Sequence, residues 1–533
     1  MSANHAPIIL NGKTLTTSQL VAIARDGAQV GLDPAVSGLL ASSRAAFEKK
    51  LARHEVIYGV NTGFGGNVKF LIADDDMGNL QQNLLRSLSC GVGEPLPAAI
   101  VRGSMLLRAN ALCNGYSAVR PVVVERLLQL LNAGITPVTP RYGSVGASGD
   151  LVPSAHIARA LIGDGAVDYQ SRRMPALEAM RLAGIEPITL LPKEGLALLN
   201  GTTVMTSAAA LVVDQADYLS LLILVQVALA GEILRGNTDA FEPLIHEMKH
   251  HPGQIEAARL LREASTGSTL LQDLDTLREN IRQRSGGATG TVELETHIQT
   301  PYSLRCAPQG LGQALESIAQ ARLWIEREMN SVNDNPLFDS TDERVYHTGN
   351  FYGGHVARAM DGVKIDLTTI ANWGHALMAM LMDPRFSNGL PPNLSMHPGL
   401  NNGFKGVQLA HTSLVVACRQ MCAPSSIHTL ATEQYNQDVV SLGLHSAMTA
   451  LDITALARDS LAMLALALSQ AADLRGVGKG TVRLGTATDR LYRGVRAVVQ
   501  ILENDRALET DIAAVSQQLQ MRSIDLGLKI RGI

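Results

Sequence analysis

The chain has 533 residues, 18% of them charged, and a formal net charge of -4 at pH 7. Its length is enough to bury a large hydrophobic core. The small net charge excludes a surface dominated by one sign, of the kind that attracts nucleic acid or an anionic membrane, and favours a small neutral substrate.

The cysteines and the first residues bear on the compartment. There are five cysteines with no C-x-x-C pair, which argues against a disulfide framework or a thiolate metal site. Residues 1–17 carry no charged segment followed by an apolar one, so no secretion signal is predicted. We therefore expect a cytoplasmic protein.

The predicted secondary structure is almost entirely helical. Apolar residues recur at spacings of three and four in the segments 96–114, 203–235, 309–330, 357–382, 405–422 and 439–472. Several of these exceed the ordinary helix of about 11 to 12 residues, as is typical of helical bundles. The most apolar stretch, 218–230, is bracketed by Asp217 and Glu232 and is too short to cross a bilayer, so it reads as a buried core helix. The sequence predicts a mainly α fold built around one long helical bundle.

Clusters of glycine and polar residues lie between the predicted helices and are the expected positions of chemistry. They fall at 58–67, 141–150, 200–202, 333–338 and 433–438. In the second cluster, glycines at 143, 146 and 149 lead into a predicted helix that begins at Leu151. The tripeptide Ala147, Ser148 and Gly149 is capable of a specific reaction, although a glycine-rich helix cap would have the same sequence. If the loop is compressed, the Gly149 nitrogen can attack the Ala147 carbonyl, and loss of two waters, one from Ser148, leaves a methylidene-imidazolone ring.

Seven ordered blocks between about Glu55 and Arg475 carry a family resemblance. They are YGVNTGFG (58–65), GSVGASGDL (143–151), KEGLALLNGT (193–202), YSLR (302–305), NDNPL (333–337), GNF (349–351) and NQD (436–438). With them the sequence resembles the methylidene-imidazolone family of histidine, phenylalanine and tyrosine ammonia-lyases and their 2,3-aminomutase relatives. The resemblance implies the helical bundle of the ammonia-lyase type, which is fumarase- and aspartase-like. It also implies a ring-bearing domain at 1–200, a central bundle at 201–475 and a helical segment at 476–533.

The resemblance also implies residue roles. Ser148 supplies the methylidene carbon of the ring, and no metal or added organic cofactor is needed. Tyr58 is the implied base, and it needs a positive neighbourhood to work near neutral pH because a free tyrosine titrates near 10. Arg305 suits a bidentate clamp on the substrate carboxylate, with Tyr302 on the same turn for proton transfer or amine orientation. The remaining implied substrate- or ring-binding residues are Gly65, Ser87, Leu88, Asn200, Phe351, Lys405, Glu433 and Gln437.

The implied assembly is a homotetramer whose active sites draw Tyr58, Ser148 and Arg305 from different subunits. The small-molecule substrate is an aromatic amino acid, with neither nucleic acid nor membrane as partner.

Two other motifs compete with this interpretation. The string HEMKH (246–250) matches a zinc protease motif, in which His246 and His250 bind the metal and Glu247 is the base. Pro243 and Pro252 leave its helix little more than two turns, so zinc is disfavoured. The segment 476–481 resembles the end of a phosphate-binding loop, but Asp473 replaces the opening glycine. A non-enzymatic scaffold descended from lyases would be expected to have lost Ser148 or Arg305, and both are present.

The substrate class depends on Ser87 and Leu88. In the resemblance these positions line the ring pocket, with Phe-Leu in phenylalanine enzymes, His-Leu in a tyrosine group and Ser-His in histidine enzymes. The Ser-Leu pair of this chain matches none of them. Leu88 would leave imidazole nitrogens unpaired, which costs about 1 to 3 kcal/mol each. We therefore expect a lyase acting on phenylalanine, tyrosine or a related substrate, with tyrosine-like rings favoured and with aminomutase and histidine lyase activities as alternatives.

Overall fold

The computed structural model describes residues 6–286, 290–291, 293 and 298–533. The described chain separates into two compact units. Unit 1 comprises Met1–Asp214, Ala321–Asp361 and Pro424–Leu451, and unit 2 comprises Gln215–Gln320, Gly362–Ala423 and Asp452–Ile533. The three-part division expected from the sequence stays a prediction.

Unit 1 holds the N-terminal helices and all the short strands found among the described residues. Its helices are α1 (Thr17–Ala24), α2 (Pro34–Leu51), α3 (Met77–Ser87), α4 (Ala98–Leu112), α5 (Pro121–Ala133), α6 (Leu151–Leu161), α7 (Ala176–Leu182) and α8 (Glu194–Leu199). Its strands are β1 (Ile8–Leu10), β2 (Val30–Leu32), β3 (Val92–Pro95), β4 (Thr136–Pro137), β5 (Pro140–Tyr142), β6 (Ala166–Tyr169), β7 (Arg172–Pro175), β8 (Leu337–Asp339) and β9 (Arg344–Tyr346). Three two-stranded sheets pair β1 with β2, β3 with β5 and β8 with β9, and β4, β6 and β7 form a three-stranded sheet.

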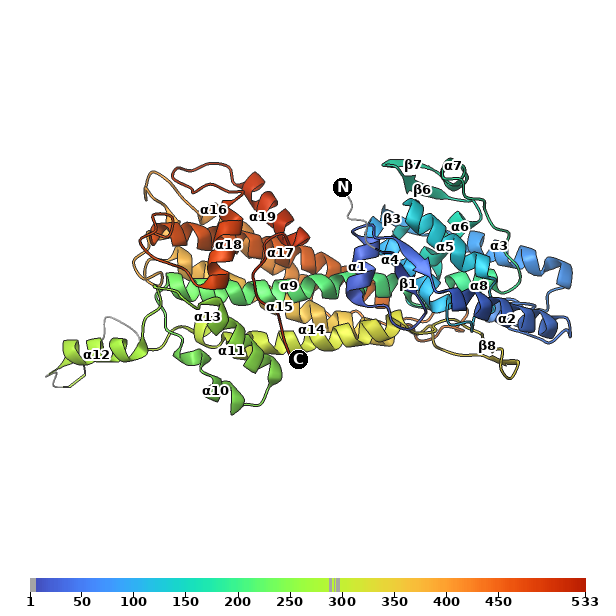
Figure 1. Ribbon diagram of the computed structural model, residues 1–533, viewed down its shortest axis with the longest axis horizontal. Helices are drawn as coiled ribbons and strands as arrows, with labels where there is room; N and C mark the ends of the chain where they lie inside the picture. The colour runs from blue at the N-terminus through green and yellow to red at the C-terminus, as the bar shows by residue number, and fades with distance from the viewer. Residues whose placement is uncertain (1–5, 287–289, 292, 294–297) are drawn as a thin grey trace. The chain divides into compact units, whose positions relative to one another are not determined.

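The regular secondary structure of unit 2 consists of helices wherever the chain is described. It contains α10 (Pro243–Glu247), α11 (Pro252–Ala264), α12 (Leu274–Ser285), α13 (Tyr302–Arg305), α16 (Lys405–Met421), α18 (Thr486–Arg496) and α19 (Glu509–Met521). Four long helices contribute residues to both units, namely α9 (Thr203–Ile233), α14 (Ala307–Met329), α15 (Gly354–Met382) and α17 (Gly443–Leu474) (Figure 1).

The predicted mainly α fold is confirmed. Each of the six long helical segments expected from apolar spacing is a helix, and its bounds differ from the prediction by four residues at most. The local sequence explains where some of the helices begin and end. Thus α5 starts with Pro121 at its first position and stops at Gly134, whose φ of 75° is a left-handed cap.

The most buried of the long helices is α9. Its Ala, Leu and Val side chains are buried on nearly every face, as expected for a helix in the middle of a core. Among the described residues, α9 is long and apolar enough to cross a membrane by length and composition alone, yet 72% of its apolar window is buried inside the protein. This burial agrees with the core helix expected from the sequence.

Candidate active site

A tight turn carries the Ala147, Ser148 and Gly149 tripeptide at the entry to α6. Gly146, Ser148 and Gly149 have φ values of 76°, 52° and 79°, all left-handed, and Gly146 pairs with Gly149 in an antiparallel bridge. A left-handed φ is uncommon for a serine and marks a conformation imposed by the surroundings. The tripeptide therefore lies in a tight turn, which is the kind of loop expected for ring closure.

Backbone from the α8–α9 junction holds the turn in place. Ser148 O accepts hydrogen bonds from Gly201 N at 3.1 Å and from the Asn200 side-chain amide at 3.2 Å. Asp150 N donates to Gly201 O at 2.8 Å. A Cβ atom on Gly149 would lie 2.0 Å from Gly201 O, so only glycine permits this approach. We call these contacts the 200–201 brace.

The Asp150 carboxylate ties the turn to the start of α9. It is fully buried, and it accepts from the Ser144 hydroxyl at 2.8 Å and from Met205 N at 2.7 Å. Burial raises the pKa of Asp150 to about 6, against the lowering effect of these hydrogen bonds and of the Arg108 charge. The carboxylate also lies where the N-terminal dipole of α9 favours negative charge.

A second tight turn approaches Ser148 from residues 433–437. Glu433, Gln434 and Tyr435 are all left-handed, with φ between 51° and 61°. This turn brings the Gln437 amide to 3.2 Å from Ser148 Oγ, where it donates a hydrogen bond. The Glu433 carboxylate accepts from Gly66 N at 2.9 Å and so joins this turn to the glycine-rich loop that follows Tyr58.

The predicted base, Tyr58, is partly buried in that loop. Its phenol oxygen accepts a hydrogen bond from Gly65 N at 2.9 Å. Burial raises the pKa of Tyr58, the Gly65 hydrogen bond lowers it, and the negative charge of Glu433 raises it further. The net effect is a raised pKa, whereas a base that works near neutral pH needs a lowered one. The positive charge expected near Tyr58 is therefore not supplied by the described residues of unit 1.

These residues line one pocket of about 550 Å³. It brings together eight of the predicted site residues, namely Tyr58, Gly65, Ser87, Leu88, Ser148, Asn200, Glu433 and Gln437. The pocket also has an apolar wall that was not predicted, which includes Phe64, Phe70, Leu80, Leu84 and Leu196. Helical spacing was an available signal for two of them, because Leu80 and Leu84 precede Leu88 by two turns and one turn on the same face.

Six predicted site residues do not line this pocket. Two of them, Ala147 and Gly149, flank Ser148 in the turn itself. Phe351 is half-buried elsewhere in unit 1. Tyr302 and Arg305 lie on α13 of unit 2, where the Arg305 guanidinium stacks 4.5 Å from the Tyr302 ring centroid and its Nε donates to Thr300 O. The exposed Lys405 begins α16, also in unit 2. The adjacency of Tyr302 and Arg305 on one turn agrees with the sequence analysis.

The competing zinc motif is not preorganised for a metal. His246 is buried, and its ring nitrogens contact Ala240 O at 3.0 Å and the Gln254 amide at 2.9 Å. The helix α10 ends at Glu247, and His250 follows it with a left-handed φ of 66°. No group of three potential metal-binding side chains occurs among the described residues.

The phosphate-loop resemblance also lacks its structural context. Residues 476–481 form a turn in which Thr481 Oγ1 donates to Gly476 O, and the next helix, α18, begins only at Thr486. The hydroxyl is thus used within the turn itself.

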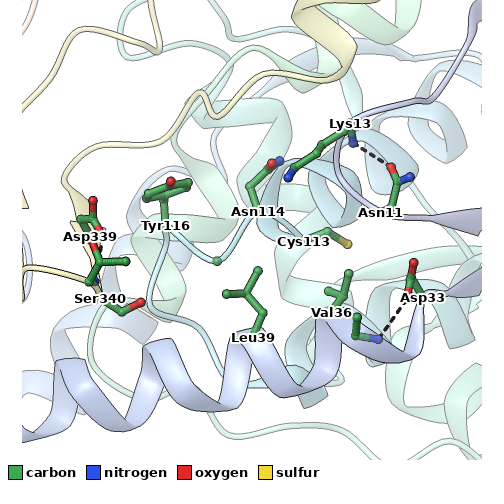
Figure 2. A pocket seen from close by; sticks show the side chains of 13 residues that line it. Asn11, Lys13, Asp33, Val36, Leu39, Cys113, Asn114, Tyr116, Asp339 and Ser340 are labelled. Atoms are coloured by element: carbon green, nitrogen blue, oxygen red, sulfur yellow. Dashed lines mark hydrogen bonds between the residues drawn. The ribbon is translucent and has the colours of Figure 1, made fainter.

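Unit 1 has another cleft, of about 430 Å³, between α2 and the turn that follows α4 (Figure 2). Its Asp33 carboxylate caps α2 by accepting from Ala35 N, and its Asp339 accepts from Thr341. Burial raises the pKa of the Cys113 thiol to about 12, which makes it a poor nucleophile. None of the predicted site residues lines this cleft, so the pocket around Ser148 is the candidate active site.

Known proteins similar to this chain match it over nearly its whole length. A model of the aromatic amino acid lyase family matches residues 15–497. The histidine ammonia-lyase of Geobacillus thermodenitrificans is 40% identical over 97% of this chain and 98% of its own. The tyrosine ammonia-lyase of Cupriavidus metallidurans is 40% identical over 98% of this chain and 97% of its own. Among solved structures, the tyrosine aminomutase of Streptomyces globisporus has a TM-score of 0.94 and 35% identity, covering 99% of this chain and 100% of its own.

Fold, pocket and relatives together define an enzyme of the carbon–nitrogen lyase class. Its helical architecture is that of the ammonia-lyases and aminomutases. The chain belongs to the aromatic amino acid lyase family.

Proposed function

We propose that the protein is an aromatic L-amino acid ammonia-lyase that forms a methylidene-imidazolone ring from Ala147, Ser148 and Gly149. The observation that supports this proposal most directly is the left-handed turn at Ser148, which the 200–201 brace holds beside a pocket of about 550 Å³. The residues fit such a ring, because the tripeptide lies in a tight left-handed turn and the buried Asn200 Oδ1 has no hydrogen-bond partner among the described residues. When present, the ring supplies an electrophile that makes the substrate amine a better leaving group.

The chain's own side chains would position the substrate and move the proton. The overall reaction converts the amino acid into ammonia and a trans-arylacrylate. Tyr58 would accept the β-proton as a phenolate, whose charge the Gly65 N–H stabilises. Because burial and Glu433 both raise the pKa of Tyr58, a second subunit is a suitable source of the missing positive charge.

Arg305 of unit 2 suits that role in a homotetramer with composite sites, where it would also clamp the substrate carboxylate. Tyr302, Lys405 and Phe351 would complete the site in the same way.

Subunit mixing tests the composite site. Tyr58→Phe and Arg305→Met subunits would each be inactive alone, and co-refolding them would restore part of the activity because some sites receive both native residues. An active monomer in a sizing experiment, or no recovery on mixing, would contradict the composite site.

The geometry of Ser87 favours substrates whose ring carries a hydrogen-bond donor. Ser87 Oγ donates to Leu84 O at 3.1 Å, so its proton is committed to the helix and its oxygen is left as an acceptor. A phenolic hydroxyl can donate to such an oxygen, whereas phenylalanine offers no donor. We therefore propose tyrosine-like substrates, with phenylalanine as the weaker substrate.

A matched pair of serine variants tests the ring preference. Ser87→Ala should lower the tyrosine-to-phenylalanine ratio of kcat/KM by about 2- to 10-fold, which is the value of one hydrogen bond. Ser89→Ala is the control, because Ser89 Oγ makes the same kind of bond to Leu85 O, at 2.7 Å, without lining the pocket. Equal effects of both variants would show that Ser87 does not contact the ring.

Two alternatives within the family have specific support. Several relatives are named histidine ammonia-lyases, and a closely superimposable structure is a tyrosine aminomutase. Incubation with tyrosine, phenylalanine, 3,4-dihydroxyphenylalanine and histidine, with identification of each product, separates them. Urocanate forming fastest would favour the histidine enzyme, and β-amino acid as main product would favour the aminomutase. We propose that the enzyme acts in the cytoplasm, without nucleic acid or membrane.

A further inference from the structure

A buried arginine lies directly behind the brace that holds the 147–149 turn. Arg108, on α4, is 3% exposed, and none of its three guanidinium nitrogens has a hydrogen-bond partner among the described residues. A Cβ atom on Gly201 would lie 2.9 Å from Arg108 Nη2, so the guanidinium packs against the Gly201 backbone. Gly201 is the residue whose N donates to Ser148 O and whose O accepts from Asp150 N.

The charges around Arg108 form a compact buried group. Asp334 and Asp150 attract it, while Lys193, bonded to Asp334 at 2.5 Å, repels it. All four side chains are at most 3% exposed. Two cations and two carboxylates balance only when Asp150 is ionised, so Arg108 and the charged form of Asp150 stabilise each other.

Arg108 also borders a very small cavity. It has a volume of about 10 Å³ and is lined by the hydroxyl residues Ser104, Ser154 and Thr203 and by apolar side chains of α5, α6 and α8. This is room for about one water, too little for a substrate. A guanidinium left without direct partners costs several kcal/mol. Arg108 is buried despite this unfavourable free energy, and it packs on the Gly201 backbone that shapes the site. This combination points to a role of Arg108 in that site.

We propose that Arg108 is a positioning residue for ring formation, which supports Gly201 against the 147–149 turn and keeps Asp150 charged. Without the cation, the buried Asp150 takes up a proton and accepts less strongly from Met205 N and Ser144, so the turn loosens. The inference rests on the proposed function, since it presupposes that the ring forms.

Charge-removing and charge-keeping variants test this role. Arg108→Gln removes the charge, Arg108→Lys keeps it, and Arg102→Gln is the matched control. Arg102 lies on the same helix and is partly buried, but its guanidinium donates to Ile23 O, Ala24 O and Leu131 O. Each protein is produced as inclusion bodies, dissolved in urea before it has folded, and then folded for the first time between about pH 6 and about pH 9. The ring is measured by its near-ultraviolet absorbance and by the loss of two waters from the peptide that contains Ser148.

Arg108→Gln should refold with little ring at neutral pH and gain it as the pH rises and Asp150 ionises. A merely structural role would give no such recovery. A ring fraction equal to that of Arg102→Gln at every pH would overturn the proposal. If Arg108→Gln does not refold, Arg108→Lys decides. A ring fraction equal to that of the wild type at neutral pH supports the proposal, because lysine keeps the positive charge beside Asp150, and a ring fraction far below the wild type at neutral pH in a folded Arg108→Lys protein overturns it. A wild-type protein without the ring would overturn the proposed function as well.

Discussion

Adding one methyl group to Gly149 should dismantle the candidate site. In Gly149→Ala, the new Cβ would lie 2.0 Å from Gly201 O, far inside the 3.4 Å at which ordinary contact begins. The left-handed φ of 79° costs a non-glycine residue roughly 1 to 2 kcal/mol. Moving the brace weakens two hydrogen bonds, Gly201 N to Ser148 O and Asp150 N to Gly201 O, worth about 0.5 to 1.5 kcal/mol each. The sum of about 2 to 5 kcal/mol is a large part of the stability of a typical domain.

Gly134→Ala separates the two contributions to this cost. Gly134 has a nearly identical φ of 75°, but a Cβ atom there meets nothing within 4 Å. Both variants should therefore carry the conformational cost, and only Gly149→Ala should lose the contact with Gly201. The assay compares urea unfolding midpoints and the fraction of protein that has lost two waters at the tripeptide. Equal midpoints together with an equal ring fraction in the two variants would refute the reasoning.

Three further predictions follow from the site and its surroundings. Tyr58→Phe should keep the ring absorbance and lower kcat/KM by about 100- to 10,000-fold, because a phenol is lost and the fold is not; unchanged turnover would exclude Tyr58 as the base. Burial raises the pKa of Glu232 from 4.5 to about 7, so the folded protein holds this proton more tightly than the unfolded chain. The contribution of Glu232 to stability should fall by about 3 kcal/mol as the pH rises from about 4.5 to about 7. Glu232→Gln should flatten the dependence of the melting temperature on pH in this range, and an unchanged dependence would contradict the pKa shift. Chelators should leave turnover unaffected, whereas inactivation that zinc reverses would revive the role of His246.

Much of the fold could be predicted because helical periodicity is a local signal. The six long helices and the helix at Leu151 follow from apolar spacing, and their ends differ by only a few residues from those expected. The zinc motif could be weighed in the same way, since two prolines limit its helix.

The assembly of the site could not be derived locally. Ser148 meets Asn200 across 52 positions and Gln437 across 289, and no periodicity encodes such contacts. The family resemblance indicated these residues. It did not indicate Arg108, because an arginine within an apolar helical segment looks like any other until its burial is known. The sign of the charge near Tyr58 was missed for the same reason, since Glu433 reaches the loop through a turn of left-handed residues.

The separation of the segments that meet at Ser148 has a consequence for biosynthesis. Residues 147–149 are translated long before Gln437. The turn that they form is nevertheless held by hydrogen bonds from residues 200–201 and from Gln437. A nascent chain, or one truncated before 437, would therefore carry an ordinary alanine, serine and glycine. The electrophile would arise only in chains that have completed the surrounding fold. Under the proposed chemistry, the ring absorbance of a preparation would then count its correctly folded molecules, and a misfolded chain would carry no reactive group.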